Sequence, residues 1–248
     1  MKVVFLGTNG WYDTPTGNTI CTFLETEHYY ILLDAGNGIY KLNKYLKDSK
    51  KTIYLFLSHF HLDHIEGLHI LNKFNFKNKL KIYGQRGARE VLDKIINQPF
   101  TVPFKDLPFD VDVYEIDEGI HELPFEVECR FLLHASPCLG YRLKLDGKVV
   151  TYCTDTGTHE NVENLAKDAD LLITECSLRM EDKNPGWPHL NPEEAVKIAL
   201  KAKAKNLALT HFDAHNYPSM NDRIESKASM LKLFKNILYT TDEMKIDL

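Results

Sequence analysis

Residues 58–64 of the chain read Ser58-His59-Phe60-His61-Leu62-Asp63-His64. They place three imidazoles and one carboxylate directly after the continuous apolar run of residues 52–57, which predicts a buried strand. His59 and His61 are two positions apart, so in an extended loop their side chains point the same way. Neutral imidazole and carboxylate are ligands that borderline divalent ions prefer. The alternative, a solvated histidine-rich loop, would leave four such groups poorly paired, so the stretch predicts a metal site at a strand end.

Short apolar runs and amphipathic segments continue along the rest of the chain. Runs rich in β-branched and aromatic residues predict strands over residues 2–6, 20–25, 29–34, 79–83, 125–133, 141–145, 148–153, 170–174 and 206–210. Periodic patterns predict helices over residues 39–46, 65–74, 87–97 and 219–235, and Asn191-Pro192 predicts the start of another. Asp146-Gly147 between two strands predicts a tight hairpin. Strands and helices are therefore expected along the whole chain, with no linker.

Composition narrows the class of protein. The chain has 248 residues, with 30 Lys and Arg against 35 Asp and Glu, and a formal net charge of −5. At 44% hydrophobic residues it is expected to bury a sizeable core. The acidic balance argues against broad electrostatic capture of nucleic acid. No apolar run approaches the roughly 20 residues that span a membrane, so no membrane association is expected.

The five cysteines indicate the cellular compartment. Their number is odd and they form no C-x-x-C pair, which argues against a disulfide scaffold. A cytoplasmic protein is therefore expected.

With the motif of residues 58–64 as a start, the chain resembles the metallo-β-lactamase superfamily. That family has a lone His after a β-rich stretch, an Asp after a later strand and a His after a final strand. His134, Asp155 and His211 occur in this order, each behind an apolar run. The openings Phe5-Leu6-Gly7-Thr8 and Leu33-Asp34-Ala35-Gly36 are also similar to the family. The resemblance spans nearly the whole chain and implies an α/β protein, a four-layer αβ/βα sandwich, with residues 1–248 as a single domain.

The resemblance also implies a set of metal ligands. One metal would be bound by His59, His61 and His134, a second by Asp63, His64 and His211, with Asp155 bridging the two. Two divalent ions that share one water favour hydroxide near neutral pH, so a metal-bridging hydroxide is the expected nucleophile. Zinc is the expected metal, and manganese or iron are the alternatives because the ligands mix nitrogen and oxygen. Asp63 is expected to take part in catalysis as well as in metal binding.

Two further residues resemble the ribonuclease Z type of phosphodiesterase within this family. Glu175 ends the strand after Asp155, and His189 precedes a helix with the spacing of that branch. There the pair places an imidazole near the scissile phosphate, and a carboxylate behind an imidazole raises its basicity, as a general acid requires. Glu175 and His189 are therefore expected to be catalytic. Arg142, on a predicted strand, is either an ordinary strand residue or points at substrate.

One family element is missing. The tRNA-processing members carry a long basic arm, which in the bacterial form lies between the residues matched here by His134 and Asp155. In this chain a tight hairpin fills that interval, so tRNA is not an expected substrate. The irregular stretch of residues 99–109 is a surface loop held by hydrophobic contacts, a wall of the active site or a contact of a homodimer.

The sequence thus predicts a dinuclear metal-dependent hydrolase. The expected reaction is hydrolysis of a small or single-stranded phosphodiester. The alternative is hydrolysis of a thioester or ester, as in glyoxalase-II-like or lactonase members, in which case Glu175 and His189 would be structural. A third class, a non-hydrolytic metal-binding or diiron redox protein, normally has a carboxylate where His61 stands and a flavin domain, and the chain has neither.

Overall fold

The computed structural model describes residues 1–47 and 50–248, and in this part of the chain the strands form two seven-stranded sheets and one two-stranded pair. The first sheet contains, in spatial order, β16 (Lys245–Asp247), β1 (Lys2–Gly7), β3 (Cys21–Glu25), β4 (Tyr29–Leu33), β5 (Thr52–Phe56), β6 (Leu80–Gly84) and β7 (Val111–Glu115). The second contains β15 (Ile237–Tyr239), β13 (Leu207–Thr210), β12 (Leu171–Glu175), β11 (Lys148–Cys153), β10 (Leu139–Leu145), β9 (Glu126–Phe131) and β8 (Gly119–Glu122). The small pair joins β2 (Asn9–Gly10) to β14 (Phe212–Asp213).

Each large sheet is antiparallel on one side and parallel on the other. In the first sheet β4, β5, β6 and β7 pair in parallel, and in the second β11, β12, β13 and β15 do so. Ligand sites of parallel sheets lie outside the carboxyl ends of the strands. Polar residues that follow β4, β5, β11, β12 and β13 are therefore delivered to the edge where a site is expected.

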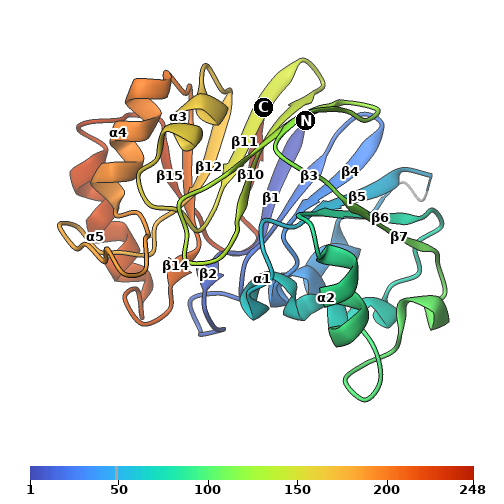
Figure 1. Ribbon diagram of the computed structural model, residues 1–248. Helices are drawn as coiled ribbons and strands as arrows, with labels where there is room; N and C mark the ends of the chain where they lie inside the picture. The colour runs from blue at the N-terminus through green and yellow to red at the C-terminus, as the bar shows by residue number, and fades with distance from the viewer. Residues whose placement is uncertain (48–49) are drawn as a thin grey trace.

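Helices cover the outer faces of both sheets (Figure 1). The α-helices are α1 (Leu62–Ile65), α2 (Ala88–Ile95), α3 (Glu160–Ala166), α4 (Pro192–Ala202) and α5 (Met220–Met230). Three segments are 3₁₀ helices: η1 (Asn37–Lys44), η2 (Glu66–Lys73) and η3 (Phe104–Asp106). In Figure 1, α3, α4 and α5 lie outside the second sheet, and α1 and α2 lie on the side of the first.

The core is divided into three hydrophobic clusters by the two sheets. Because side chains alternate along a strand, Val4 and Leu6 of β1 pack outward against helices, whereas Val3 and Phe5 pack inward against the other sheet. The inner cluster also contains residues of the second sheet such as Tyr141. A third cluster lies between the second sheet and α3–α5. This order, helix, sheet, sheet, helix, confirms the predicted four-layer αβ/βα sandwich.

The two chain ends meet in the first sheet. β16 pairs antiparallel with β1, and the backbone N–H of Leu248 donates to the carbonyl of Met1 at 3.0 Å. The labels N and C accordingly lie close together in Figure 1. None of the described helices combines the length and the apolar character needed to cross a bilayer.

Most predicted elements are present with small changes of boundary, but some helices differ. Residues 39–46 and 65–74 form mainly the 3₁₀ helices η1 and η2, and the last helix ends at Met230 instead of residue 235. Strands β7 and β8 and helix α3 are additional to the prediction. Asn191 caps α4, its side chain accepting from the backbone N–H of Glu194 at 2.9 Å, as predicted.

Contacts within the chain bear on two points that the sequence left open. Arg142 donates from Nη1 to the carbonyls of Leu165 and Lys167 at 2.6 and 2.7 Å. Its guanidinium therefore binds the C-terminal end of α3 and has a structural role. Within residues 99–109, Phe104, Leu107 and Phe109 pack against the outer cluster of the first sheet. No residue of this stretch lines the cleft over the predicted ligands described below, so the stretch is not an active-site wall.

Candidate metal centre and active site

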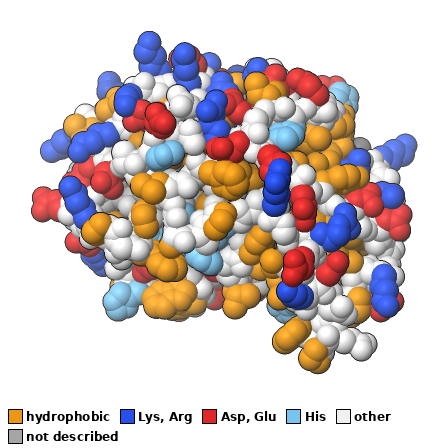
Figure 2. All heavy atoms as spheres, in the orientation of Figure 1, with side chains coloured by type: hydrophobic (Ala, Val, Ile, Leu, Met, Phe, Trp, Pro, Cys, Tyr) orange, Lys and Arg blue, Asp and Glu red, His pale blue; other side chains and the backbone are white. Residues whose placement is uncertain are grey.

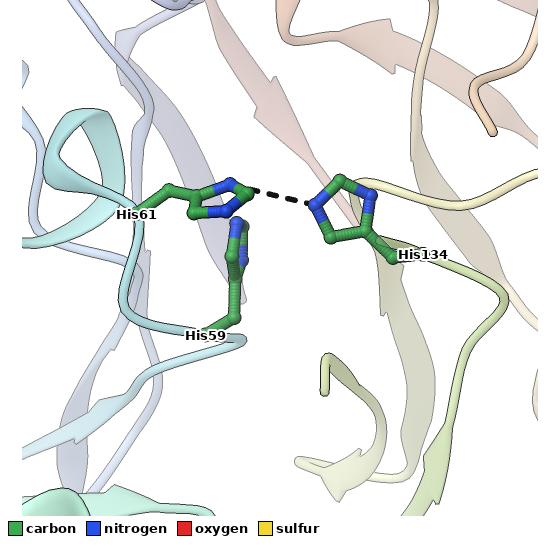
Figure 3. A group of neighbouring side chains, drawn as sticks. All are labelled: His59, His61 and His134. Atoms are coloured by element: carbon green, nitrogen blue, oxygen red, sulfur yellow. Dashed lines mark hydrogen bonds between the residues drawn. The ribbon is translucent and has the colours of Figure 1, made fainter. Parts of the chain in front are cut away.

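The first predicted ligand group comes from two segments far apart in the chain. His59 and His61 lie in the loop between β5 and α1, and His134 follows β9 (Figure 3). The three rings point toward one another, and one ligand atom of each lies within 4.8 Å of the others. His134 Nε2 is 3.4 Å from His61 Nδ1. Burial lowers the pKa of all three imidazoles, which favours the neutral form that can coordinate a metal.

The second predicted group lies beside the first. Asp63, His64 and His211 also place one ligand atom each within 4.8 Å of the others. The Nε2 atoms of His64 and His211 are 3.1 Å apart, and Asp63 Oδ2 is 3.3 Å from His211 Nε2. Burial alone would lower the pKa of His64, but Asp155, Asp63 and Asp34 outweigh it and raise that pKa well above its usual range.

Asp155 lies between the two groups. Its Oδ2 is 3.0 Å from His64 Nε2 and 3.3 Å from His211 Nε2. Asp155 is also within ligand distance of His59 of the first group. Burial by itself would raise the pKa of Asp155, but His211 and His64 outweigh burial and hold it well below the usual range. An ionised carboxylate in this position can reach both groups.

Partners on the far side of the imidazoles fix which nitrogen faces the cluster. Asp34, directly after β4, accepts from His64 Nδ1 at 2.8 Å, from Ser58 Oγ at 2.7 Å and from the Tyr152 hydroxyl at 2.7 Å. Ser58 Oγ is also 3.0 Å from His59 Nδ1. The Nε2 atoms of both histidines are thereby turned toward the ligand cluster, as in metal sites where an outer hydrogen bond orients each imidazole.

His211 is fixed in the same way from the other side of the site. Ser177 Oγ is 3.1 Å from His211 Nδ1, which directs Nε2 inward. Gly10 of β2 lies against the ring, and a Cβ atom on Gly10 would come within 2.4 Å of His211 Cε1. Only glycine can therefore stand at position 10 with the ring in this place. The β2–β14 pair thus brings the N-terminal loop onto a residue from the far end of the chain.

Four residues at this edge have a left-handed backbone. Their φ angles are 56° for Asp34, 52° for Asp155, 51° for His211 and 72° for Trp11. Non-glycine residues seldom adopt this conformation, and where they do the surrounding structure must hold them. For Trp11 one restraint is visible: its backbone N–H donates to Asp63 Oδ2 at 2.8 Å.

The donor set fits divalent metal ions. Imidazole nitrogens and carboxylate oxygens of the two groups converge at one edge, and Nε2 of His59 is buried without a hydrogen-bond partner in the described structure. A buried polar atom without a partner is costly unless another group satisfies it. A metal ion coordinated by His59 would do so.

His189 and Glu175 form a pair beside this donor set. His189 Nδ1 lies 2.7 Å from Glu175 Oε1 and 4.0 Å from Asp155 Oδ1. Glu175 is fully buried and also accepts from the backbone N–H of Thr156 at 2.6 Å. Burial would lower the pKa of His189, but the Glu175 carboxylate and its hydrogen bond outweigh this and raise the pKa to about 9. The pairing leaves Nε2 of His189 as the nitrogen free to act on a substrate.

A cleft of about 700 Å³ opens over these residues. Its walls include His61, Asp155 and His189 at the base, and the exposed side chains of Trp11 and Trp187. All predicted site residues thus lie together: His59, His61, Asp63, His64, His134, Asp155, Glu175, His189 and His211.

Asp34, Ser177, Trp11 and Trp187 also lie at the site, although the sequence did not indicate a role for them. Asp34 and Ser177 orient imidazoles, and Trp11 and Trp187 line the cleft. The signal for Asp34 was present, because it is a lone carboxylate at the end of the apolar run of residues 29–33. The other three come from irregular loops, where no periodicity indicates which way a side chain points.

Comparisons with known proteins agree with this geometry. Residues 29–212 match the family profile described as a beta-lactamase superfamily domain. Ribonuclease Z of Pyrococcus abyssi is 30% identical over 85% of this chain and 86% of its own. The probable metallo-hydrolase YhfI of Bacillus subtilis is 28% identical over 85% of this chain and 86% of its own.

Solved structures share the fold. The crystal structure of YhfI from Bacillus subtilis superposes with a TM-score of 0.80 at 23% identity, covering 99% of this chain and 98% of that one. A structure described as a new diphosphatase from the PhnP family gives a TM-score of 0.75 at 18% identity, covering 100% of this chain and 97% of that one. At these identities the superpositions bear on the fold alone.

Proposed function

The chain belongs to the metallo-β-lactamase superfamily and is a metal-dependent hydrolase, and from this premise we propose that it is a dinuclear phosphodiesterase acting on small or single-stranded phosphoesters. The observation that carries the proposal is the Glu175–His189 pair, joined at 2.7 Å and adjoining Asp155 of the ligand cluster. In the alternative, an ester or thioester hydrolase, the pair would be structural.

We propose that each chain holds two divalent ions. His59, His61 and His134 would bind one, Asp63, His64 and His211 the other, and Asp155 both. Divalent ions in these places would neutralise charge on the phosphate oxygens and make water a stronger nucleophile at neutral pH. Zinc is the proposed metal, with manganese or iron as alternatives for a mixed nitrogen and oxygen donor set.

The proposed reaction assigns one proton transfer to the protein. His189, protonated and held through Nδ1 by Glu175, donates a proton from Nε2 to the leaving oxygen of the phosphodiester. Asp63 is the second proposed catalytic residue besides being a ligand. Its Oδ2 is held by the backbone N–H of Trp11, so the carboxylate faces the cleft in one orientation.

Elemental analysis and a substrate survey test the proposal. Protein purified without chelators should contain two metal ions per chain and should hydrolyse bis(4-nitrophenyl) phosphate faster than a thioester such as S-lactoylglutathione. Asp155→Ala should lower metal content and hydrolysis together, and Asp106→Ala, an exposed carboxylate outside the cleft, should change neither. Full activity toward the thioester alone would show that the protein is a thioester or ester hydrolase and not a phosphodiesterase. An inactive Asp155→Ala that still held two ions tightly would make Asp155 a base and not a shared ligand.

Location and assembly are the remaining parts of the proposal. We propose a cytoplasmic protein, since Cys21, Cys129, Cys138, Cys153 and Cys176 are all free and buried. Residues 1–248 are proposed to fold as a single domain. A homodimer remains a prediction that light scattering of the purified protein would test.

A further inference from the structure

The sequence contains two tryptophans, and both line the cleft over the ligand cluster. Trp11 follows β2 and is 66% exposed, and Trp187 precedes α4 and is 46% exposed. Tryptophan is enriched at interfaces, where one end of the side chain is apolar and the other is in water. Neither indole belongs to a hydrophobic core cluster of the described residues.

Trp187 is held parallel to a ligand of the site. Its ring stacks on His61 with centroids 5.7 Å apart and planes inclined by 13°, and its edge meets His134 at 5.8 Å. The indole is thus fixed over the first ligand group while nearly half of the residue stays open to solvent. A flat surface is thereby offered directly beside the place where a phosphate would bind.

Trp11 is held by its backbone and not by its ring. The N–H that donates to Asp63 Oδ2 fixes the main chain, and the left-handed φ of 72° is a conformation that bulky residues rarely adopt. The ring contacts Tyr12 edge-on at 5.3 Å and otherwise faces the cleft. A strained aromatic residue at a functional edge points to a role in binding.

The charge of the cleft limits what else can bind. Among the described residues that line it, Asp63, Glu66, Asp155 and Asp213 are acidic and none is Lys or Arg. Figure 2 likewise shows hydrophobic and histidine side chains together at the lower edge of the molecule, below β2 and β14, where Lys and Arg are sparse. A polynucleotide is gripped through its many phosphates by cations. This cleft can neutralise the charge of one phosphate at its base but would repel further ones.

We propose that Trp11 and Trp187 form a stacking site for one planar aromatic group, a nucleobase, so that the substrate is a diester of mononucleotide size with a single phosphate. This inference rests on the proposed phosphodiesterase function and narrows its substrate class. The cleft volume of about 700 Å³ lies in the range of small-molecule sites. Stacking of a base on an aromatic side chain is independent of base identity, so no preference among bases is expected.

Two esters with the same leaving group and one phosphate each test the proposal. Zinc-loaded protein should hydrolyse thymidine 5′-(4-nitrophenyl) phosphate with a higher kcat/KM than methyl 4-nitrophenyl phosphate. Trp187→Leu and Trp11→Leu should lower the ratio of the two kcat/KM values by about 5-fold or more each, the usual effect of losing one stacking partner. The ratio cancels any general loss of activity. Trp187→Phe should restore part of it, and Phe100→Leu, an exposed aromatic outside the cleft, should leave it unchanged.

Fluorescence supplies a second measurement that needs no turnover. Because both tryptophans line the cleft, tryptophan emission, excited selectively over that of tyrosine, reports on that place alone. Thymidine 5′-monophosphate should quench the emission of the zinc-loaded protein, and inorganic phosphate should not. Trp11→Leu and Trp187→Leu each leave one indole, so the two sides can be followed separately.

The outcomes separate this inference from the function on which it rests. Quenching by the nucleotide without hydrolysis of either ester would retain the stacking site and reject the phosphodiesterase. Hydrolysis of both esters at similar kcat/KM, with ratios unchanged in both leucine variants and no quenching, would retain the phosphodiesterase and overturn the stacking site.

Discussion

At the scale of single residues, three imidazoles of the candidate site are each held by a hydrogen-bond partner on one ring nitrogen. Glu175 holds His189, Asp34 holds His64, and Ser177 holds His211, each by a hydrogen bond of 2.7–3.1 Å. Since each imidazole has two nitrogens, fixing one decides what the other can do. The next two predictions concern residues that hold one ring nitrogen of an imidazole, or the imidazole itself.

Replacing His189 tests the proton transfer. His189→Ala should leave both metals bound and lower the rate on phosphodiesters by about 10²–10⁴-fold, the usual contribution of general acid catalysis. The loss should shrink for leaving groups such as nitrophenolate, which need little protonation, and Glu175→Gln should cost less in the same direction. Rates over a series of leaving groups, together with metal content, give the answer. An equal loss for every leaving group would indicate phosphate binding in place of acid catalysis.

Replacing Asp34 tests the support of the second ligand group. Asp34→Asn keeps the shape of the side chain but weakens its acceptor role toward His64 Nδ1, so we expect metal affinity to fall by about 10–100-fold. Competition with a zinc-binding dye measures the dissociation constant, and circular dichroism confirms the fold. Asp106→Asn serves as the exposed control. An unchanged dissociation constant would mean that the histidine is oriented by the backbone alone.

At the scale of elements, the short β2–β14 pair joins the two ends of the site. Arg223 of α5 is 1% exposed and holds this pair in place. Its guanidinium donates from Nη2 to Asn9 Oδ1 at 2.5 Å and from Nη1 to the Thr240 carbonyl at 3.0 Å. It also lies over the ring of Phe212, with Cζ 4.3 Å from the centroid. A helix remote from the chemistry thus holds the loop that carries Trp11.

Removing this guanidinium should destabilise the protein. Arg223→Met removes the arginine donors to the buried carbonyl of Thr240 and to Asn9 Oδ1, which keeps only the longer bond from the Thr16 hydroxyl. The free energy of unfolding should therefore fall by about 1–3 kcal/mol. Arg86→Met, at an exposed arginine, should stay within about 0.5 kcal/mol. Urea denaturation compares the two variants, and equal stabilities would show that the buried arginine is not needed to hold the loop.

The strands show which elements a sequence can reveal. Runs such as residues 52–57 were predictable because both faces of the strand are buried and the residues are continuously apolar. Strands β7 and β8 lie at the sheet edges, carry charged residues and are half exposed, so their sequences resemble loops. The apolar periodicity of residues 65–74 correctly predicted a helical segment, but it cannot distinguish an α-helix from the 3₁₀ helix η2.

The candidate site also contains residues that the sequence could predict and residues that it could not. Its ligands were predictable because the motif of residues 58–64 and the strand-end residues His134, Asp155 and His211 carry their chemistry in the residue type. Trp11 and Trp187 were not, since only the packing of distant loops places an ordinary aromatic residue over a ligand. Residue type can indicate a ligand, whereas a cleft wall depends on tertiary structure.

At the scale of the whole molecule, the site lies at an edge to which both sheets contribute. Ligands come from the loops that follow β5, β9, β11 and β13, so metal binding would join the two halves of the sandwich. Binding to the folded state alone stabilises a protein in proportion to the logarithm of ligand concentration.

Metal removal should therefore lower thermal stability. At a zinc concentration 100 times the dissociation constant the gain is about 2.7 kcal/mol, which for a chain of this size raises Tm by about 5–10 °C. Differential scanning fluorimetry of chelator-treated and zinc-loaded protein measures the shift. Asp155→Ala should lose most of it. Identical Tm values with and without zinc would argue against a metal centre.

Precursor tRNA should be cleaved far less efficiently than small diesters. The alignment with ribonuclease Z of Pyrococcus abyssi is 269 positions long and that with YhfI is 220, so the ribonuclease carries segments that this 248-residue chain lacks. The described lining of the cleft also contains no Lys or Arg, which argues against binding of a folded RNA there. Gel assays at two salt concentrations decide the matter. Efficient, salt-insensitive cleavage would direct attention to the loop of residues 99–109 as a gripping element.

The left-handed backbone of Trp11 has a consequence for how the chain has been selected. A bulky residue in this region costs about 1–2 kcal/mol relative to glycine, and an indole that remains mostly in water returns little of that cost through packing. Selection for stability alone would replace the tryptophan with glycine or asparagine. Under the stacking role proposed above, Trp11 contributes binding at the expense of stability. A screen that rewards only heat resistance would be expected to replace this residue, and to leave a more stable protein that binds its substrate less well.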